Sequence, residues 1–445
     1  MVRTRVRAWL DSHRDQLVND IRTLVQTESV CCVGDSAEPY GSGCASVLRQ
    51  FLQLAESYGF ETQNHENHCG SVLLRGNTET EIGLWGHLDV VAPGDGWSYP
   101  PFSASQSGDF LLGRGVQDNK GPVIATLYTL RCLRDLNIPL RHTFRQVAGC
   151  AEEAGMEDVR YYLSRNASPA FSVVTDCGFP VCHGEKGLLE ITLISPPLNG
   201  TLQSICGGIA SNIVPDQATL TLQDGTRRTA AGRSGHVAFP EGSVNAIAVL
   251  LHESLDKDSF TEPEIRALSF LAAVCSETDG STLGVACADT CSGALTAVGS
   301  VICREADGSL SLKVNIRYPV TMTEAVLLRN LDRTAADHFF RIRRDHGSSP
   351  NYVAPDHPGV QALTAAYNRV TQQKTAPFVM GGGTYARMLP NAIAFGPGLP
   401  VDLSPLLLAP GHGGCHAPDE AVSIPNLLTA IEIYVEAFQD LDRTL

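Results

Sequence analysis

GHLDVVAPGDGW, residues 86–97, is the stretch that decides the fold. It follows the apolar run IGLW at residues 82–85 and places His87 and Asp89 two residues apart. Side chains alternate along an extended strand, so residues i and i+2 face the same way. An imidazole and a carboxylate on one side of a strand end are typical of a metal ligand and the group that orients it. Such a pair can also do no more than cap a turn, so its interpretation depends on the rest of the chain.

Further acidic side chains stand where other apolar segments begin or end. HTFRQVAGCAEEAG, residues 142–155, and AFSVVTDCG, residues 170–178, each predict a strand that ends shortly before an acid, and a helix is expected from Asn119 onward. The acids at these boundaries are Asp118, Glu152, Glu153 and Asp176. Ligands of open α/β sheets bind outside the carboxyl ends of the strands. These acids are therefore expected to converge with His87 on one site.

The spacing of apolar residues predicts an α/β domain that is interrupted by a second, α+β domain. Residues 1–187 combine amphipathic helices with apolar strands that are typical of a buried, mostly parallel sheet. Residues 188–350 contain strands that alternate apolar and polar side chains, as half-exposed antiparallel strands do. Residues 351–445 have the α/β pattern again, so the first domain is expected to be discontinuous.

Composition restricts the classes of function. The 445 residues carry a net charge of −15, which disfavours nucleic acid as a partner because phosphate binding needs a basic surface. The 14 cysteines are scattered and form no CxxC motif, which disfavours a structural zinc site of that kind and indicates reduced thiols. No apolar run reaches the roughly 18 residues that a membrane span needs. We therefore expect a cytoplasmic protein with no membrane contact.

The clustered acids predict a metal site. Carboxylates that share a site raise one another's pKa, and two divalent cations would remove this conflict. A site with two metals needs a bridging ligand, and Asp118 is the natural candidate. A second imidazole is available in GHGGCHAPDE, at His412 or His416. His416 precedes a Pro-Asp-Glu turn that holds it, whereas His412 lies among glycines, so His416 is the preferred ligand.

Six motifs carry a family resemblance. They are GHLDVVAPGDGW, LLGRGVQDNKGP, AEEAG, TDCGFPVCHGEKG, GGGTYARMLPNAIAFGP and HAPDE. In this order they resemble the PepV-type (Sapep-like) dipeptidases of peptidase family M20, which also holds aminoacylases and carboxypeptidase G. The resemblance covers nearly the whole chain. It implies a zinc-peptidase-like catalytic domain, with helices flanking a mostly parallel central sheet, and an inserted α+β lid domain.

The resemblance implies a metal-binding role for five residues. It implies that His87 and Asp176 hold one ion, that Glu153 and His416 hold the other, and that Asp118 bridges the two. The ions are expected to be Zn²⁺, with Mn²⁺ or Co²⁺ as alternatives.

Two further acids near the metals are implied to act in other ways. Glu152 is implied to be the general base, and Asp89 to lie behind His87 and tune it. Asn119 stands where many relatives have a second aspartate, so metal affinity is expected to differ.

The resemblance also implies contacts to substrate. His236 is expected to donate to the oxyanion, Arg317 to grip the carboxylate of a dipeptide, and Asn212 to touch substrate from the lid. The run Gly381–Thr384 permits close approach of the backbone to a ligand. The substrate-binding candidates of this region are Gly382, Gly383, Thr384 and Arg387, the last of which could equally brace the loop.

These expectations predict hydrolysis of dipeptides by a water that two metals and Glu152 activate. An enlarged lid takes the place of a partner subunit in PepV-type enzymes, so a monomer is expected. Two alternatives stay open. One is an N-acyl amino acid deacylase or desuccinylase of the same superfamily, and the other is a non-catalytic relative that binds peptides.

Overall fold

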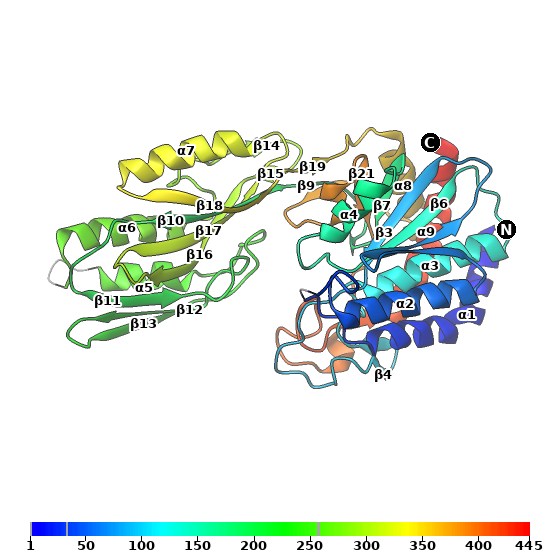
Figure 1. The fold of residues 1–445 in the computed structure, drawn as a ribbon, viewed down its shortest axis with the longest axis horizontal. Coiled ribbons are helices and arrows are strands. Elements are labelled where there is room, and N and C mark those ends of the chain that lie inside the picture. Colours follow the sequence, from blue (N-terminus) through cyan, green and yellow to red (C-terminus); the bar gives the residue numbers. More distant parts are fainter. Residues whose placement is uncertain (1, 33, 256–258) are drawn as a thin grey trace. The chain divides into compact units, whose positions relative to one another are not determined.

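The computed structural model describes residues 2–32, 34–255 and 259–445. The chain divides into two compact units, whose elements are labelled in Figure 1. Unit 1 comprises Met1–His183, Tyr352–Phe378 and Thr384–Leu445. Unit 2 comprises Gly184–Asn351 and the short segment Val379–Gly383. The glycine run that we expected in the second part of the first domain thus clusters with unit 2.

Unit 1 is built on a mixed sheet with helices. In the described residues its helices are α1 (Val2–Val25), α2 (Ser42–Ser57), α3 (Lys120–Asp135), α4 (Glu157–Arg165), α8 (Pro358–Thr371) and α9 (Ile424–Thr444), with the 3-10 helices η1 (Tyr385–Met388) and η2 (Ser404–Leu406). The main sheet has the order β1 (Glu61–His65), β2 (Cys69–Leu74), β6 (Thr143–Gly149), β3 (Glu81–His87), β7 (Phe171–Val174), β21 (Ala392–Phe395), β9 (Val181–Glu185) and β19 (Asn351–Tyr352), and β20 (Phe378–Met380) pairs with β9. Smaller sheets join β4 (Ser105–Ser107), β5 (Phe110–Leu112) and β23 (Ala421–Ser423), and β8 (Cys177–Gly178) and β22 (Pro397–Gly398).

The central strand β3 is apolar on both faces, and both faces are covered. Ile82 and Leu84 belong to one core together with side chains of α1, α2, α3, α8 and α9. On the other face, the Trp85 ring packs edge-on against Tyr162 of α4 and Tyr385 of η1. This double cover is typical of parallel strands and explains why the run is continuously apolar.

The register of the parallel strands brings their carboxyl ends level. Strand β3 pairs in parallel with β6 and with β7, and β21 continues this parallel set beside β7. His87 lies opposite Gly149, and Trp85 lies opposite Val174. The residues that follow these strand ends therefore emerge at one edge of the sheet, as the sequence predicted.

Unit 2 is an antiparallel sheet covered by helices. Its strands run in the order β13 (Arg227–Ala231), β12 (Gln217–Leu222), β11 (Leu202–Gly207), β16 (Thr296–Arg304), β17 (Leu310–Tyr318), β10 (Gly187–Ile194) and β18 (Arg341–Ser348). The helices in the described part of this unit are α5 (Ala246–Ser254), α6 (Glu262–Ser276) and α7 (Glu324–Asp337), and β14 (Ala288–Asp289) pairs with β15 (Gly293–Ala294). Alternate residues of β17 point into the core of this unit, which confirms the period-two pattern.

One expectation about β17 is wrong. The polar face of this strand, which we expected to be half-exposed, is largely buried: Asn315 is fully buried and Arg317 is 8% exposed. Polar partners cover this face, because Arg317 donates from Nε to Oδ1 of Asn315 at 3.0 Å and from Nη1 to the Gly381 carbonyl at 3.2 Å. Buried polar side chains need such partners.

None of the helices in the described part of the chain combines the length and hydropathy that a membrane span requires.

Candidate metal centre

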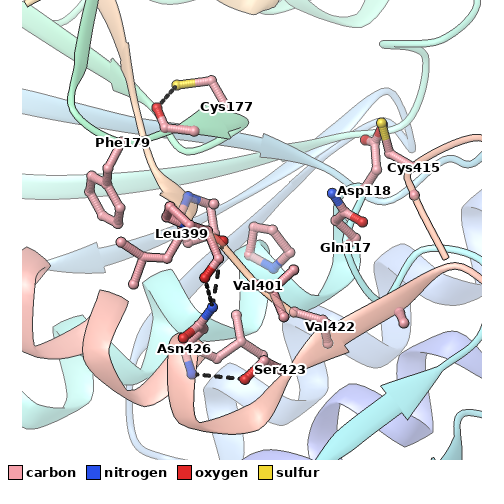
Figure 2. A pocket seen from close by; sticks show the side chains of 18 of the residues that line it. Gln117, Asp118, Cys177, Phe179, Leu399, Val401, Cys415, Val422, Ser423 and Asn426 are labelled. Carbon is pink, nitrogen blue, oxygen red and sulfur yellow. Dashed lines mark hydrogen bonds between the residues drawn. The ribbon is translucent and has the colours of Figure 1, made fainter. Parts of the chain in front are cut away.

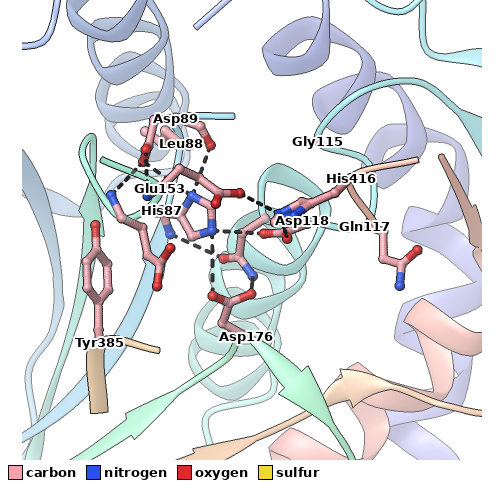
Figure 3. A network of polar contacts seen from close by, with 12 residues as sticks. His87, Leu88, Asp89, Gly115, Gln117, Asp118, Glu153, Asp176, Tyr385 and His416 are labelled. Atoms are coloured by element: carbon pink, nitrogen blue, oxygen red, sulfur yellow. Dashed lines mark hydrogen bonds and ion pairs between the residues drawn. The ribbon is translucent and has the colours of Figure 1, made fainter. Parts of the chain in front are cut away.

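Two imidazoles and one carboxylate form the middle of the candidate site (Figure 3). Oδ1 of Asp118 lies 2.9 Å from Nε2 of His87, and Oδ2 of the same carboxylate lies 3.1 Å from Nε2 of His416. Each imidazole also faces a second acid. Nε2 of His87 is 3.5 Å from Oδ2 of Asp176, and Nε2 of His416 is 2.9 Å from Oε1 of Glu153. The arrangement is two histidine–carboxylate pairs joined by Asp118.

His87 is held in one orientation by backbone and side-chain contacts. Its Nδ1 donates to the backbone carbonyl of Asp89 at 2.9 Å, which leaves Nε2 directed at the acids. Its backbone N–H donates to Oδ1 of Asn119 at 3.2 Å. The amide nitrogen of Asn119 in turn donates to Oδ1 of Asp176 at 2.6 Å. Asn119 therefore connects two of the candidate ligands, and such outer contacts orient ligands and tune a metal.

The loop after β6 is anchored by two buried carboxylates. The N–H groups of Glu152 and Glu153 donate to the two oxygens of Asp89, each at 3.1 Å. The N–H groups of Cys150 and Ala151 donate to Oδ2 of Asp158, at 2.7 and 2.8 Å. Four consecutive backbone N–H groups thus donate to carboxylates, and these bonds fix the loop that carries Glu152 and Glu153.

Asp158 also binds a residue of the GGGTYARM motif. The Tyr385 hydroxyl, in the first turn of η1, donates to Oδ2 of Asp158. A Cβ at Gly149 would overlap both this hydroxyl and Oδ2, so only glycine fits at the end of β6.

A third buried carboxylate, Glu420, anchors the loop that carries Asp118. Its Oε1 accepts from the N–H groups of Gly115, Gln117 and Asp118 at 3.0, 2.8 and 3.1 Å. Its Oε2 accepts from Arg114 at 2.6 Å, and Arg114 also donates to the His416 carbonyl at 3.2 Å. The Arg114–Glu420 pair therefore connects the loop that carries Asp118 to the loop that carries His416.

The electrostatics of the cluster show an excess of negative charge. Hydrogen bonds to Asp118 and Glu153 raise the pKa of His416 to about 10. Burial opposes the charged form of His87, but its bonds to Asp118, Asp176 and Asp89 raise its pKa well above the ordinary value. The acids thus favour the protonated form of both imidazoles when no cation is bound. Divalent cations would supply the same positive charge.

The donor set fits a divalent cation. One ligand atom from each of His87, Asp118 and Glu153 lies within 4.8 Å of the others. Imidazole nitrogen and carboxylate oxygen are the ligands of catalytic zinc sites. Asp118 presents one oxygen to each imidazole, which is the arrangement that a bridge between two ions needs.

Other predicted residues of unit 1 lie as follows. Glu152 is partly exposed beside the cluster, and burial of its carboxyl raises its pKa well above the ordinary value, with His87 opposing and Asp176 adding to the shift. His412 does not join the cluster, because its Nδ1 bonds to Oδ2 of Asp419 at 2.7 Å. The side chain of Thr384 is buried and caps η1, and Arg387 lies in the same 3-10 helix.

The predicted residues of unit 2 gather in one part of that unit. The segments of Asn212 and His236 are neighbours, since Ile213 forms a backbone bridge with His236 and the Val237 N–H donates to the Asn212 carbonyl at 3.1 Å. The chain then continues to Ala238.

The glycine run meets this segment on one side and Arg317 on the other. A Cβ at Gly381 would lie 2.9 Å from the Ala238 side chain, and Arg317 donates to the Gly381 carbonyl. Gly382 and Gly383 follow directly in the chain.

Sequence reasoning missed the functions of three buried residues, which are Asn119 as a link between ligands, Asp158 and Glu420. Glu420 stands inside HAPDE, and Asp158 follows AEEAG by three residues, so both lie in or beside motifs that we had singled out. Glu420 bonds to residues about 300 positions away, and Asp158 joins a nearby loop to the distant Tyr385, so no local pattern identifies either role.

Comparisons with known proteins identify the family. The family described as Peptidase family M20/M25/M40 matches residues 83–440. The chain belongs to this family. It is therefore a peptidase by descent, a hydrolase that acts on peptide bonds, and the resemblance inferred from the sequence motifs is confirmed.

Relatives and solved structures extend over the whole chain. A putative dipeptidase, YtjP, of Bacillus subtilis (strain 168) is 31% identical, with 97% of this chain and 98% of the relative covered. The Beta-Ala-Xaa dipeptidase of Lactobacillus delbrueckii subsp. lactis is 27% identical, with 97% of each covered. Human carnosine dipeptidase 1 superposes with a TM-score of 0.65 at 16% identity, covering 100% of this chain and 99% of that one. The last likeness confirms the predicted fold class.

Proposed function

We propose that this peptidase is a dipeptidase that works with two divalent metal ions. The observation that carries the proposal is the position of Asp118, whose two oxygens each face a different imidazole. In the proposed assignment His87 and Asp176 hold one ion, and Glu153 and His416 hold the other. The names of the two sequence relatives, both dipeptidases, support the substrate class.

The bound ions would supply Lewis acidity, which lowers the pKa of water toward neutrality and polarises a carbonyl group. Glu152 would take the proton of the attacking water and return it to the leaving amine. Burial raises the pKa of Glu152 above its ordinary value, which strengthens this carboxylate as a base. Asp89 would keep Glu152 in place, because it accepts the N–H of Glu152 and orients His87 through its backbone carbonyl.

We assign the remaining contacts to unit 2. Arg317 would bind the C-terminal carboxylate of the dipeptide, because a guanidinium forms two parallel hydrogen bonds with a carboxylate. The exposed imidazole of His236 would donate to the oxyanion, and Asn212 and the Gly382–Gly383 backbone would contact substrate. Unit 2 would thus act as a lid, and we propose a cytoplasmic monomer with Zn²⁺ as the resident metal and Mn²⁺ or Co²⁺ as substitutes.

The test is a hydrolysis assay on metal-reconstituted protein. Protein stripped with a chelator is loaded with Zn²⁺, Mn²⁺ or Co²⁺, and bound metal is counted per chain. We expect about two ions per chain, cleavage of dipeptides, and weak or no cleavage of N-acyl amino acids. Glu152→Gln should retain the metal and lose activity, by about two to four orders of magnitude in kcat.

Two outcomes contradict the proposal. Preference for N-acyl amino acids would favour a deacylase. Binding of dipeptides without turnover, equal in wild type and Glu152→Gln, would favour a non-catalytic protein.

A further inference from the structure

A cavity of about 560 Å³ opens beside the candidate metal ligands and lies wholly within unit 1 (Figure 2). This volume is in the range of small-molecule sites. Asp118 and Asp176 belong to its wall. The cavity therefore reaches the acids at which the proposed function places the scissile bond, and it can receive a group attached close to that bond.

The wall away from the acids is mostly apolar, with Ser423 and Asn426 as its polar side chains. Its apolar side chains include Phe179, Leu399, Val401, Leu403 and Val422. In Figure 2, Asp118 and Cys415 lie on one side of the cavity, and Phe179 and Leu399 lie on the other. None of the lining residues that the structure describes is Lys, Arg or His. An acidic group in this cavity would have no cationic partner from the chain, whereas an apolar group would leave water.

The apolar wall is fixed before any ligand binds. The Phe179 ring stacks on Tyr367 with centroids 5.2 Å apart, and a Cβ at Gly396 would overlap this ring. The Phe179 N–H donates to the Gly398 carbonyl at 2.8 Å. The side-chain amide of Asn426 donates to the Pro400 carbonyl at 3.2 Å and so holds the loop that carries Leu399, Val401 and Leu403. A preformed pocket lowers the ordering cost of binding its occupant.

We propose that this cavity is the specificity pocket for the side chain of the N-terminal residue of the dipeptide, and that it selects medium to large apolar side chains. The inference rests on the proposed function. There the C-terminal carboxylate is assigned to Arg317 of unit 2, so a pocket built from unit 1 alone is assigned to the residue that supplies the scissile carbonyl. An N-terminal β-alanyl residue has no side chain to fill the cavity and is expected to be a poorer substrate.

Leu-Gly and Gly-Leu test this assignment, because they have the same composition and differ in which residue carries the side chain. Wild type should cleave Leu-Gly with a kcat/KM about 10- to 100-fold above that for Gly-Leu, and Glu-Gly should be the poorest substrate of the three.

Val401→Asp probes the pocket directly. Val401 lines the cavity and is 45% exposed, so a charge there is compatible with folding. The variant should lower the ratio of kcat/KM for Leu-Gly over Gly-Leu at least tenfold. Val401→Lys should raise the ratio for Glu-Gly over Leu-Gly. The matched control is Leu407→Asp, at a side chain that is 91% exposed and does not line the cavity, and it should leave both ratios unchanged.

A binding measurement separates recognition from turnover. In the Glu152→Gln background, calorimetric titration should show tighter binding of Leu-Gly than of Gly-Leu, and Val401→Asp should remove the difference. If wild type cleaves dipeptides but neither Val401 variant changes these ratios, or if the effect falls on Gly-Leu, the pocket assignment is wrong while the dipeptidase proposal stands. If wild type cleaves none of the dipeptides, the proposed function fails, and this inference fails with it.

Discussion

At the scale of single residues, Asn119 connects two of the candidate ligands. Its carboxamide accepts from the His87 backbone N–H and donates to Asp176. An ionised carboxylate at this position could accept the first bond but could not donate the second. The amide therefore keeps one ligand oriented without adding another negative charge to a cluster that already has an excess.

Asn119→Ala removes both contacts. We expect metal affinity to fall about 10- to 100-fold, since outer contacts of metal ligands have effects of this size. Competition with a chromophoric chelator measures the change. Asn368→Ala is the control, because Asn368 also makes side-chain bonds, to Thr375, but lies on α8. Equal affinities in wild type and Asn119→Ala would show that the amide does not support the ligands.

Asp158 illustrates a residue that acts through the backbone. One oxygen accepts from Cys150, Ala151 and Tyr385, so its removal leaves buried donors without a partner. We expect Asp158→Ala to lower the free energy of unfolding by about 2–4 kcal/mol and to lower kcat, because the loop that carries Glu152 loses one of its two anchors.

Asp158→Asn keeps one acceptor oxygen and should retain part of both properties. Chemical denaturation and steady-state kinetics measure the two effects. Asp307→Ala is a control at an exposed aspartate that accepts from the Ser309 N–H in the other unit. A loss in Asp158→Ala no larger than in Asp307→Ala would contradict the anchoring role.

At the scale of elements, the site is a set of loops that buried carboxylates hold in place. Asp89 and Asp158 hold the loop after β6, and Glu420, which immediately precedes β23, holds the loop before α3. Asp89 and Glu420 come from distant segments and Asp158 from the helix that follows the loop, and apart from His87, which ends β3, the ligands sit on loops whose paths depend on strand ends and these anchors.

The Arg114–Glu420 pair gives a prediction about these loops. Both side chains are buried, and Glu420 accepts three backbone donors besides the guanidinium. Glu420→Ala leaves Arg114 charged and unpaired, so we expect a loss of about 3–5 kcal/mol in unfolding free energy. Thermal denaturation of metal-free protein measures it without any contribution from bound ions. Arg369→Ala, which breaks half-exposed pairs with Glu436 and Asp440, should cost less than about 1 kcal/mol.

The sequence predicted the elements well where periodicity is strong. The alternating pattern within residues 188–350 corresponds to strands such as β12 and β17, and α3 begins one residue after Asn119. The convergence of His87, Asp118 and Asp176 was predictable because parallel strands deliver their ends to one edge.

The remaining features depend on partners that local patterns do not identify. Glu420 meets Gly115 across 305 positions of the chain, and no spacing rule connects them. Alternation along β17 identified which side chains face the core of unit 2. It did not predict that the opposite face is also buried, where Arg317 bonds to Asn315 and to the Gly381 carbonyl. Polar side chains at a strand surface look alike in sequence whether water or another segment covers them.

At the scale of the whole molecule, each of the two units has a large hydrophobic core of its own, and the candidate metal ligands all belong to unit 1. The excess of carboxylates therefore lowers the free energy of unfolding of unit 1 and not that of unit 2. Like charges that share a site destabilise the folded state unless protons or cations balance them.

Removal of metal should consequently affect one unit. At a free metal concentration about 1,000 times the dissociation constant, binding adds about 4 kcal/mol to unfolding free energy, and a chelator removes it. Hydrogen exchange should accelerate on chelation in peptides that cover residues 82–90, 115–120 and 150–155, and it should stay unchanged in peptides of β16 and β17 in unit 2. Asp118→Asn, which weakens the proposed bridge, should reduce the difference between metal-loaded and metal-free protein. Equal acceleration in both units would instead indicate that bound metal stabilises the whole chain as one cooperative body. Absence of any change in hydrogen exchange would contradict metal binding at this site.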